Sequence, residues 1–200
     1  SLGAVIWLGM TFLFVLGLFD DFLQIKPQTK LVGQILTALL VAFLGFRLHW
    51  FNSLTIDTMV TIAWIVGITN AFNLLDNMDG LSSGVVNMIS LILGILTVQQ
   101  GQYFSALLFL ALAGSSIGFL RYNFNPSKIF MGDAGSMLLG FITAALMISF
   151  GEKIPRWWMA SIVIFGLPIL DTATALVRRW INKKPLFVSD RGHIYDQLMD

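Results

Sequence analysis

Four amide and carboxylate side chains recur at every third position between residues 70 and 79: Asn70, Asn73, Asp76 and Asp79. On a continuing helix, this spacing places all four roughly along one face. They begin inside an apolar stretch long enough to cross a membrane, where polar groups are costly and usually mark a functional site or a water-filled cavity. The alternative is a capped helix end that Gly80 terminates. We expect a functional site.

A pair of adjacent carboxylates, Asp20 and Asp21, follows an earlier apolar run. At the C-terminus of a helix they would meet the negative end of the macrodipole, so something should compensate their charge. A divalent cation or a neighbouring lysine would do so, and repulsion between the two carboxylates would favour proton uptake, as a general base requires. The alternative is a solvated loop start next to Lys26 and Lys30.

The stretch 121–136 ends in a glycine-rich turn, G-D-A-G-S, which opens another apolar segment. Backbone N–H groups at such a helix start can face an anion, and Asp133 could hold a magnesium ion that bridges phosphates. Phe130 could stack on a base. The alternative is that Asp133 is an N-cap and that Gly135 serves the turn.

The elements that must position these residues are apolar. Hydrophobic residues make up 56% of the 200 residues and charged residues 12%, whereas soluble domains carry about a quarter charged residues, so the chain is an integral membrane protein. We expect a single membrane domain over 1–200. The absence of cysteine excludes disulfides, thiolate catalysis and cysteine-ligated metals. Seven segments approach the length of about 20 residues that a crossing helix needs: 2–19, 31–48, 58–75, 81–98, 103–120, 136–150 and 157–177.

No alternating strand pattern competes with these segments, so the expected fold class is all-α, a polytopic transmembrane helix bundle with about seven crossings. Seven crossings place the loops alternately on two sides. Arg47, Lys153 and Arg156 fall on one side, and the other nine of the twelve basic residues fall on the opposite side, which is therefore cytoplasmic. The acidic groups described above all lie on this cytoplasmic side.

The last apolar segment contains two residues that a plain crossing helix would avoid. Pro168 should break or kink the helix, and Asp171 is an intramembrane carboxylate close in sequence to Arg178 and Arg179. An ion pair explains Asp171 without catalysis. The polar residues 178–200 that follow are expected to form a cytoplasmic loop or tail.

Together these motifs resemble the polyprenyl-phosphate N-acetylhexosamine-1-phosphate transferases of glycosyltransferase family 4. The family's aspartate pair is Asp20-Asp21 here, its N-A-x-N-x-x-D-G-x-D-G-L block is 70–81, its F-M-G-D-x-G-S motif is 130–136, and its basic loop with histidine is 178–200. The motifs occur in order and cover the whole chain. Family members have about ten crossings, with two or more helices before the aspartate pair, so we expect this sequence to be an N-terminally truncated fragment.

The resemblance implies transfer of a sugar-1-phosphate, with GlcNAc-1-phosphate as the expected group, from a UDP-N-acetylhexosamine to a membrane polyprenyl phosphate such as undecaprenyl phosphate, releasing UMP. This step would initiate cell-envelope glycan synthesis at the cytoplasmic face of the plasma membrane. Mg²⁺ is the implied cofactor, with Mn²⁺ as its substitute. A homodimer is a further implied assembly, and no nucleic-acid partner is expected.

The resemblance also implies roles for single residues. Asp133 is the metal ligand, with Asn73 close to the metal and the pyrophosphate. Asp20 is the base that deprotonates the lipid phosphate, and Asp21 is its essential neighbour; a covalent mechanism with an aspartate nucleophile stays open. Asn70 belongs to the substrate-binding set, and the uridine would be held by Asp76, Asp79, Asn123 and Phe130, the last by stacking.

The chain departs from the family pattern at two places. Asn77 replaces the first glycine of D-G-x-D-G, and His193-Ile194-Tyr195-Asp196 stands where the family shows H-x-H-H. We expect Arg191 and His193 to contact the diphosphate or the sugar. The alternative is that 191–200 forms an amphipathic helix that docks on the bundle.

Two other function classes remain open. A non-catalytic cation-binding membrane protein or transporter would place its charges near the bilayer midplane, often in repeated halves, and the sequence shows no repeat. A CDP-alcohol phosphotransferase would need D-G-x-x-A-R and two further spaced aspartates, and no such pattern follows Asp79-Gly80.

Overall fold

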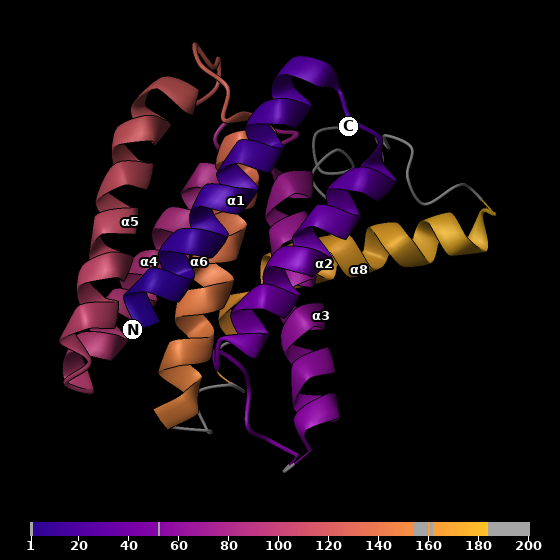
Figure 1. Cartoon of the computed structure of the whole chain (residues 1–200). Coiled ribbons are helices and arrows are strands. Elements are labelled where there is room, and N and C mark those ends of the chain that lie inside the picture. The colour runs from indigo at the N-terminus through magenta and orange to yellow at the C-terminus, as the bar shows by residue number, and fades with distance from the viewer. Residues whose placement is uncertain (1, 52, 154–159, 161, 184–200) are drawn as a thin grey trace.

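The computed structural model describes residues 2–51, 53–153, 160 and 162–183. Within these ranges the secondary structure is helical and no strand occurs, which confirms the predicted all-α class. The helices, shown in Figure 1, are α1 (Leu2–Leu23), α2 (Pro27–Phe43), α3 (Leu54–Leu75), α4 (Leu81–Gln99), α5 (Tyr103–Asn123), α6 (Gly132–Lys153) and α8 (Gly166–Ile181).

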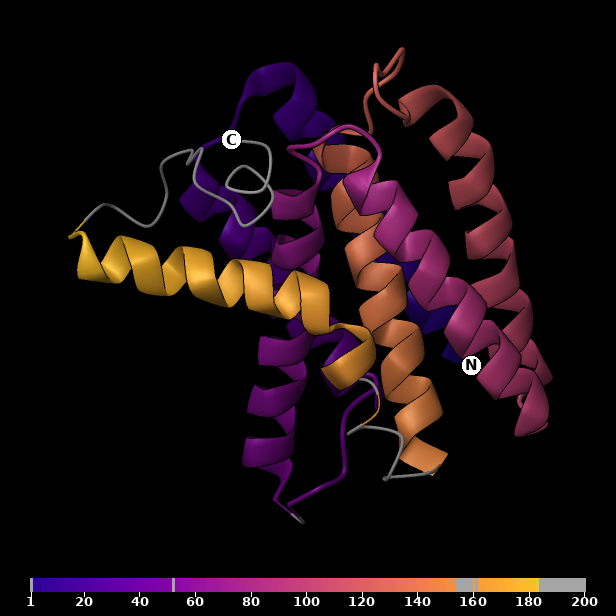
Figure 2. The same ribbon diagram turned by 180° about the vertical axis from the view of Figure 1, so that it is seen from behind.

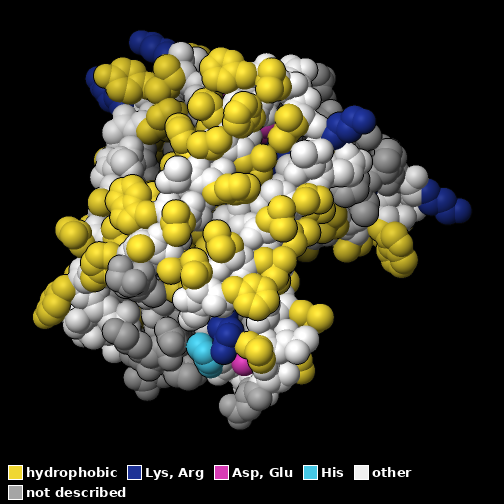
Figure 3. All heavy atoms as spheres, viewed as in Figure 1, with side chains coloured by type: hydrophobic (Ala, Val, Ile, Leu, Met, Phe, Trp, Pro, Cys, Tyr) yellow, Lys and Arg dark blue, Asp and Glu magenta, His cyan; other side chains and the backbone are white. Residues whose placement is uncertain are grey.

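The helices differ in whether they could cross a membrane. Among the described residues, α1, α3, α4, α5 and α6 are long and apolar enough to do so. The helices α2 and α8 are shorter, with 17 and 16 residues. The number of seven crossings therefore stays a prediction. Large apolar side chains cover the face shown in Figure 3, and most charged side chains lie toward its edges, as a surface in contact with lipid requires.

The central helix of the bundle is α6. It packs against α1, α3, α4 and α5, and every residue from 141 to 150 is buried. A helix that is apolar on all sides suits this position because it has no polar face that must reach water. The sequence of α6 thus explains its place as well as its length.

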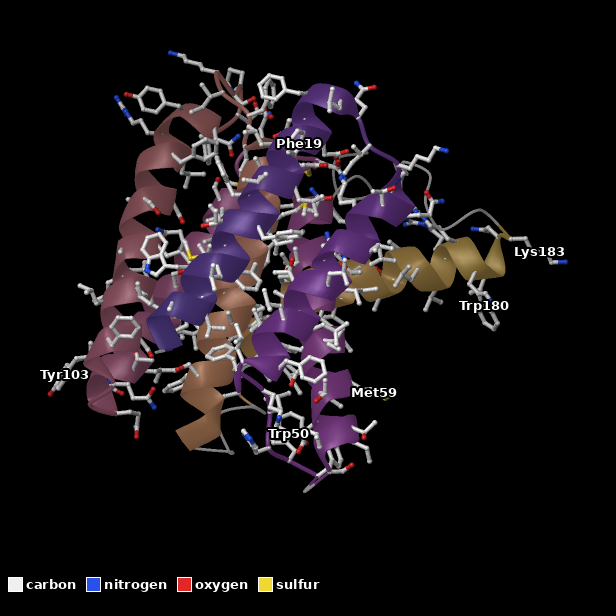
Figure 4. The ribbon with its side chains drawn as sticks, viewed as in Figure 1. Phe19, Trp50, Met59, Tyr103, Trp180 and Lys183 are labelled. Atoms are coloured by element: carbon white, nitrogen blue, oxygen red, sulfur yellow. The ribbon has the colours of Figure 1, made fainter. Side chains whose placement is uncertain are left out.

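Helices α1 to α6 run side by side and alternate in direction (Figures 1 and 2). The ends of α1, α3 and α5 and the starts of α2, α4 and α6 therefore meet at one end of the bundle, the upper end in Figure 1. In Figure 4, Phe19 marks this end, and Trp50 and Tyr103 lie toward the other. The predicted acidic groups share the upper end, as the alternating loops required.

A close approach between α1 and α6 brings two of these groups together. A Cβ added at Gly17 would lie 2.5 Å from the Cα of Ala134, so a larger residue at this position would push the two helices apart. Asp20 lies one turn after Gly17, and Asp133 directly precedes Ala134. The absent side chain therefore allows the carboxylates of α1 and α6 to meet.

The start of α2 differs from the prediction. The helix begins at Pro27 rather than at residue 31, because proline suits the first helical position, where its missing N–H leaves no bond unmade. Lys26 before it is extended, with φ −61° and ψ 139°, as a residue that precedes proline prefers. Lys30 consequently lies in the first turn of α2 and not in a loop.

The predicted segment 157–177 also differs in its described part. The helix α8 begins at Gly166 and has Pro168 in its first turn, which confirms the predicted break near this proline. It lies across α3 and not alongside it, as seen in Figure 2, and its far end with Trp180 and Lys183 points away from the bundle in Figure 4.

Phe165 fixes the beginning of α8 against the bundle. Its ring lies edge-on to Trp64 of α3, with ring centroids 5.5 Å apart, and also contacts Phe72 with centroids 6.3 Å apart. Edge-to-face contacts of this kind add to the stability that burial provides. The predicted ion pair of Asp171 with an arginine stays a prediction.

Candidate active site

Four helix ends supply one cluster of polar side chains at the upper end of the bundle. The members are Asp20 and Asp21 from the last turn of α1, Lys30 from the first turn of α2, Asn73 from the last turn of α3, and Asp133 from the first turn of α6. We call this set the acidic cluster.

Lys30 joins two of the carboxylates. Its Nζ lies 2.5 Å from Asp20 Oδ2 and also donates to Asp133 Oδ2. Its side chain is only 15% exposed, so the ion pairs are weakly screened by water. The sequence predicted that a divalent cation or a neighbouring lysine compensates the aspartate pair, with a solvated loop start as the alternative, and the ion pair of Lys30 with Asp20 confirms the lysine. The signal that could have placed it is Pro27, which starts the helix early enough to turn Lys30 toward α6.

Asn73 orients the carboxylate of Asp133 from the other side. Its Nδ2 donates to Asp133 Oδ1 at 2.6 Å and to Ser136 Oγ at 2.9 Å. Ser136 is fully buried on α6, one turn into the helix. Asp133 is therefore held on both oxygens, by an ammonium and by an amide, and the Oδ1 of Asn73 remains as an oxygen ligand for a cation.

Asp21 caps α6 from a different helix. Its carboxylate accepts hydrogen bonds from the backbone N–H groups of Asp133 at 2.8 Å and Ala134 at 3.1 Å. Gly132 makes room for this contact: its φ is +68°, and a Cβ there would lie 2.8 Å from Asp21 Oδ2. The anion that faces the start of α6 is thus a side chain of the protein itself.

Asp76 adds a further carboxylate beside the acidic cluster. Burial, with the nearby charges of Asp133 and Asp21, raises the pKa of Asp76 to about 7, although a hydrogen bond from the Gly132 backbone opposes the rise. Burial is the larger cause, because it disfavours the charged form, and the neighbouring carboxylates act in the same direction. A carboxyl group with such a raised pKa is typical of functional sites.

Asp79 does not share a helix face with Asn70 and Asn73. The expectation of one continuous helix is wrong here, because α3 ends at Leu75 and Asp76 is its C-cap. Asp79 instead accepts two hydrogen bonds from Ser127, from the backbone N–H at 3.0 Å and from the hydroxyl at 2.8 Å. Its carboxylate holds the loop 124–131 against the turn between α3 and α4.

Asn123 holds the same loop from its other side. The Oδ1 of Asn123 accepts from the Gly80 N–H at 3.1 Å and from Ser83 Oγ at 3.0 Å, and its Nδ2 donates to the Ile129 carbonyl at 3.0 Å. Phe130, next along the loop, is 77% exposed. The loop therefore presents a free aromatic ring on an anchored backbone.

Comparison with known sequences identifies the family of the chain. Residues 4–151 match glycosyl transferase family 4. The chain belongs to this family. It is 34% identical, over 97% of its own length and 57% of the relative's, to a protein of Bacillus subtilis named "Probable undecaprenyl-phosphate N-acetylglucosaminyl 1-phosphate transferase".

Two further relatives carry the names of other transferases. A phospho-N-acetylmuramoyl-pentapeptide-transferase of Levilactobacillus brevis is 34% identical over 82% of this chain and 55% of its own. A decaprenyl-phosphate N-acetylglucosaminephosphotransferase of Mycobacterium leprae is 31% identical over 92% of this chain and 54% of its own. The chain thus spans a little over half the length of the curated family members that it matches.

The acidic cluster of this glycosyl transferase family 4 chain offers the oxygen ligands that Mg²⁺ prefers. Among the described residues, no three acidic or histidine side chains already surround one point suited to a metal. The Lys30 ammonium lies between Asp20 and Asp133 instead. The carboxylates of Asp133 and Asp21 still add to the rise that burial causes in the pKa of Asp76, so their negative charge acts on this place despite Lys30. The donor set therefore fits a divalent cation bound beside Lys30.

Asn70 lies one turn below Asn73 on α3, away from the carboxylates. Its Nδ2 donates to Gln34 Oε1 of α2 at 2.5 Å and to the Val66 carbonyl at 2.9 Å. Sequence reasoning did not single out Gln34. Arg191 and His193, the predicted contacts in the tail, lie outside the described residues, and their roles stay predictions.

An apolar groove runs along α3 on the side that faces α8. Its volume is about 420 Å³, and its lining includes Trp50, Trp64, Gly67, Ala71, Ile169 and Leu176. Ala71 is the groove residue closest in sequence to Asn73, but a separation of two residues turns a helix by about 200°. The groove and Asn73 therefore lie on opposite faces of α3.

Proposed function

We propose that the protein transfers GlcNAc-1-phosphate from UDP-GlcNAc to undecaprenyl phosphate and releases UMP. The observation that carries the proposal is the meeting of Asp20, Lys30 and Asp133 at one end of a bundle of apolar helices. Membership of glycosyl transferase family 4, and the transferase names of its relatives, support the same reaction class. The excess of basic residues on this side supports a cytoplasmic site in the plasma membrane.

In the proposed reaction, a phosphate oxygen of the lipid attacks the phosphorus that carries the sugar, and the bond to the UMP oxygen breaks. Asp20 would accept the proton of the lipid phosphate as the general base, because Asp21, the other carboxylate of the pair, is engaged by the start of α6. Lys30 would hold Asp20 in place and offset the negative charge that gathers when two phosphates approach.

Asp133 and Asn73 would hold the Mg²⁺ ion, with Mn²⁺ as a substitute. When bound, the ion would neutralise the charge on the diphosphate and help the leaving group depart. Asn73 and Lys30 keep the Asp133 carboxylate fixed from both sides, so the ligand is oriented before a metal arrives. Such preorganisation lowers the cost of reaching the transition state.

The two substrates would reach the acidic cluster from different directions. The apolar groove between α3 and α8 would take the polyprenyl chain, since its lining is apolar. The uridine would stack on Phe130, whose ring is exposed on the anchored loop. Asp76, Asp79 and Asn123 lie around the same loop and turn. A homodimer remains part of the proposal, without a contact that identifies its interface.

The test is a transfer assay with membranes that contain the full-length protein. Labelled UDP-GlcNAc and, separately, labelled UDP-MurNAc-pentapeptide are supplied, and label is followed into the lipid phase. We expect transfer from UDP-GlcNAc that depends on Mg²⁺. In wild type, the rate of transfer should stop rising once the Mg²⁺ site is saturated. Asp133→Asn should need far more Mg²⁺ for any transfer. The proposal fails if no label from UDP-GlcNAc enters lipid while the protein is folded, and label from UDP-MurNAc-pentapeptide alone would identify that donor instead.

A further inference from the structure

Gln34 is an amide buried in the apolar middle of α2. The residue is 1% exposed, and a buried amide is costly unless it is hydrogen-bonded. Its Oε1 accepts a 2.5 Å hydrogen bond from Asn70 Nδ2, whose second N–H reaches the Val66 carbonyl of the same helix. The two amides therefore form a direct bridge from α2 to α3.

This bridge lies one helical turn below the acidic cluster. Lys30 precedes Gln34 by four residues, and Asn73 follows Asn70 by three, and both spacings keep the two residues of each pair on one helix face. Lys30 and Asn73 in turn both contact Asp133. The two helices that hold Asp133 from opposite sides are thus tied together just beneath it.

Two other contacts of α2 near this place are made with α1 and within α2 itself. Leu16 of α1 packs directly on Gly33, which seats α2 against α1. The Thr37 hydroxyl donates to the Gly33 carbonyl of its own helix at 2.8 Å. α2 also packs directly on α3, and the bridge of Gln34 adds a directional polar contact between the two helices at the level of Asn70.

The nitrogen of the Gln34 amide also indicates that this residue serves to bridge α2 and α3. Its Nε2 is buried and has no hydrogen-bond partner among the residues that the structure describes. An unpaired buried donor destabilises the folded state, and an apolar side chain of similar volume, such as Met, would avoid this cost. The amide at this position is therefore explained by what its oxygen does, and not by a gain in stability.

We propose that Gln34 is a positioning residue: by bridging α2 to α3 through Asn70, it sets where Lys30 and Asn73 meet at Asp133. The reaction that depends on this position rests on the proposed function above. The bridge itself does not, because it can be measured through the reactivity of Lys30. Two experiments on the full-length protein separate these parts.

The first experiment measures how accessible the Lys30 amine is. Wild type and Gln34→Met are treated with an amine-acylating reagent, and modification at Lys30 is quantified by mass spectrometry relative to the exposed Lys26. We expect several-fold faster modification of Lys30 in Gln34→Met, because α2 can move away from Asp133. The matched control is Asn87→Leu. It removes the 2.8 Å hydrogen bond from Asn87 Nδ2 of α4 to the Ala113 carbonyl of α5 and should leave the rate of Lys30 modification unchanged.

The second experiment measures transfer kinetics. In Gln34→Met we expect kcat to fall by about tenfold and KM for the UDP-sugar to stay within about twofold, the pattern of a lost transition-state interaction. The loop with Phe130 is anchored by α4 and α5 and should bind the nucleotide normally. The exchanged pair Gln34→Asn with Asn70→Gln restores an amide on each helix and should recover turnover beyond either single variant.

The outcomes are distinct. Unchanged Lys30 modification in Gln34→Met overturns the proposal, and so does an equal effect of Asn87→Leu, which would indicate a general loss of stability. A fall in kcat together with faster Lys30 modification supports it. If the wild-type protein shows no transfer at all, the proposed function fails, and the modification experiment still decides whether Gln34 positions Lys30.

Discussion

The carboxylate of Asp21 accepts a 2.8 Å hydrogen bond from the backbone N–H of Asp133, so one acidic residue caps the helix in which the other lies. The cap comes from α1 and not from the residues that precede α6. Negative charge at a helix N-terminus is stabilising, and here it also fixes the backbone beside the proposed metal ligand. Two adjacent aspartates thus have separate partners: Asp20 contacts Lys30, and Asp21 contacts the start of α6.

Replacing Asp21 should therefore lower both stability and activity. We expect Asp21→Ala to reduce the free energy of unfolding by about 1 kcal/mol, the typical cost of a lost N-cap, and Asp21→Asn by less, because one oxygen acceptor remains. Transfer should fall in the same order as Asp133 loses its fixed backbone. Thermal unfolding in detergent and the lipid transfer assay measure the two effects. The exposed Gln28 gives the control Gln28→Ala, and full stability of Asp21→Ala would contradict the cap.

Lys30 should be as important for transfer as the carboxylates that it joins. Lys30→Met leaves Asp20 and Asp133 without their shared cation, which should lower stability by roughly 3 kcal/mol. Separately, we expect transfer to fall by about a hundredfold, because the charge that offsets the approaching phosphates is lost. Lys30→Arg keeps the charge but cannot reproduce the compact ammonium, so we expect intermediate activity. Lys26→Met is the control, because Lys26 is exposed and directly precedes α2, four residues before Lys30. Normal turnover of Lys30→Met would exclude the role.

Asp76 should make stability depend on pH when no divalent cation is present. Its pKa is about 7 in the folded protein against the ordinary 3.8, so the folded state keeps a proton that the unfolded chain has released between these values. Stability is then greatest below pH 3.8 as far as this group is concerned, falls as pH rises toward 7, and is level above it. Asp76→Asn should remove this part of the slope. Unfolding with chelator across this range is the measurement, and identical slopes in the two proteins would show that another group titrates.

The helices that cross as straight apolar segments could be predicted from the sequence. Segments 58–75, 81–98 and 103–120 lie within α3, α4 and α5, because a run of about 20 apolar residues has few alternatives in a membrane. The meeting of the acidic groups at one end followed from the alternation of loops. These features depend on composition and length, which are local properties of the chain.

Other features depend on tertiary contacts that leave no local pattern. The orientation of α8 across α3 is fixed by packing of Phe165 on Trp64 and Phe72. Spacing by three predicted that Asp79 shares a face with Asn73, but α3 ends at Leu75 before the pattern does. Gln34 was missed because a single amide in an apolar run looks like a tolerated exception, and its partner Asn70 is far away in sequence.

The contact between Asp79 and Ser127 predicts that two residues act on nucleotide affinity through one loop. Ser127→Ala removes the 2.8 Å hydrogen bond from the Ser127 hydroxyl to Asp79 and keeps the hydrogen bond from the Ser127 backbone N–H. Asp79→Ala removes both hydrogen bonds. Since one neutral hydrogen bond contributes about 1 kcal/mol, we expect KM for the UDP-sugar to rise about fivefold in Ser127→Ala and more in Asp79→Ala. Turnover at saturation should change little in both, because Asp20 and Asp133 are not on this loop. Lys128→Ala, an exposed neighbour, is the control.

The double variant Asp79→Ala with Ser127→Ala decides how Asp79 acts. If Asp79 works by holding the loop, the double variant should be no worse than Asp79→Ala alone, because the single change has already removed the shared contact. The loss should also be similar for UDP and for other nucleoside diphosphates tested as competitors, since a loosened Phe130 stacks on any base less well. Fully additive losses, or a loss confined to uridine, would instead mean that Asp79 contacts the base directly once the nucleotide is bound. In that case, the bonds to Ser127 describe the nucleotide-free site, and the loop must release Asp79 before the base can bind.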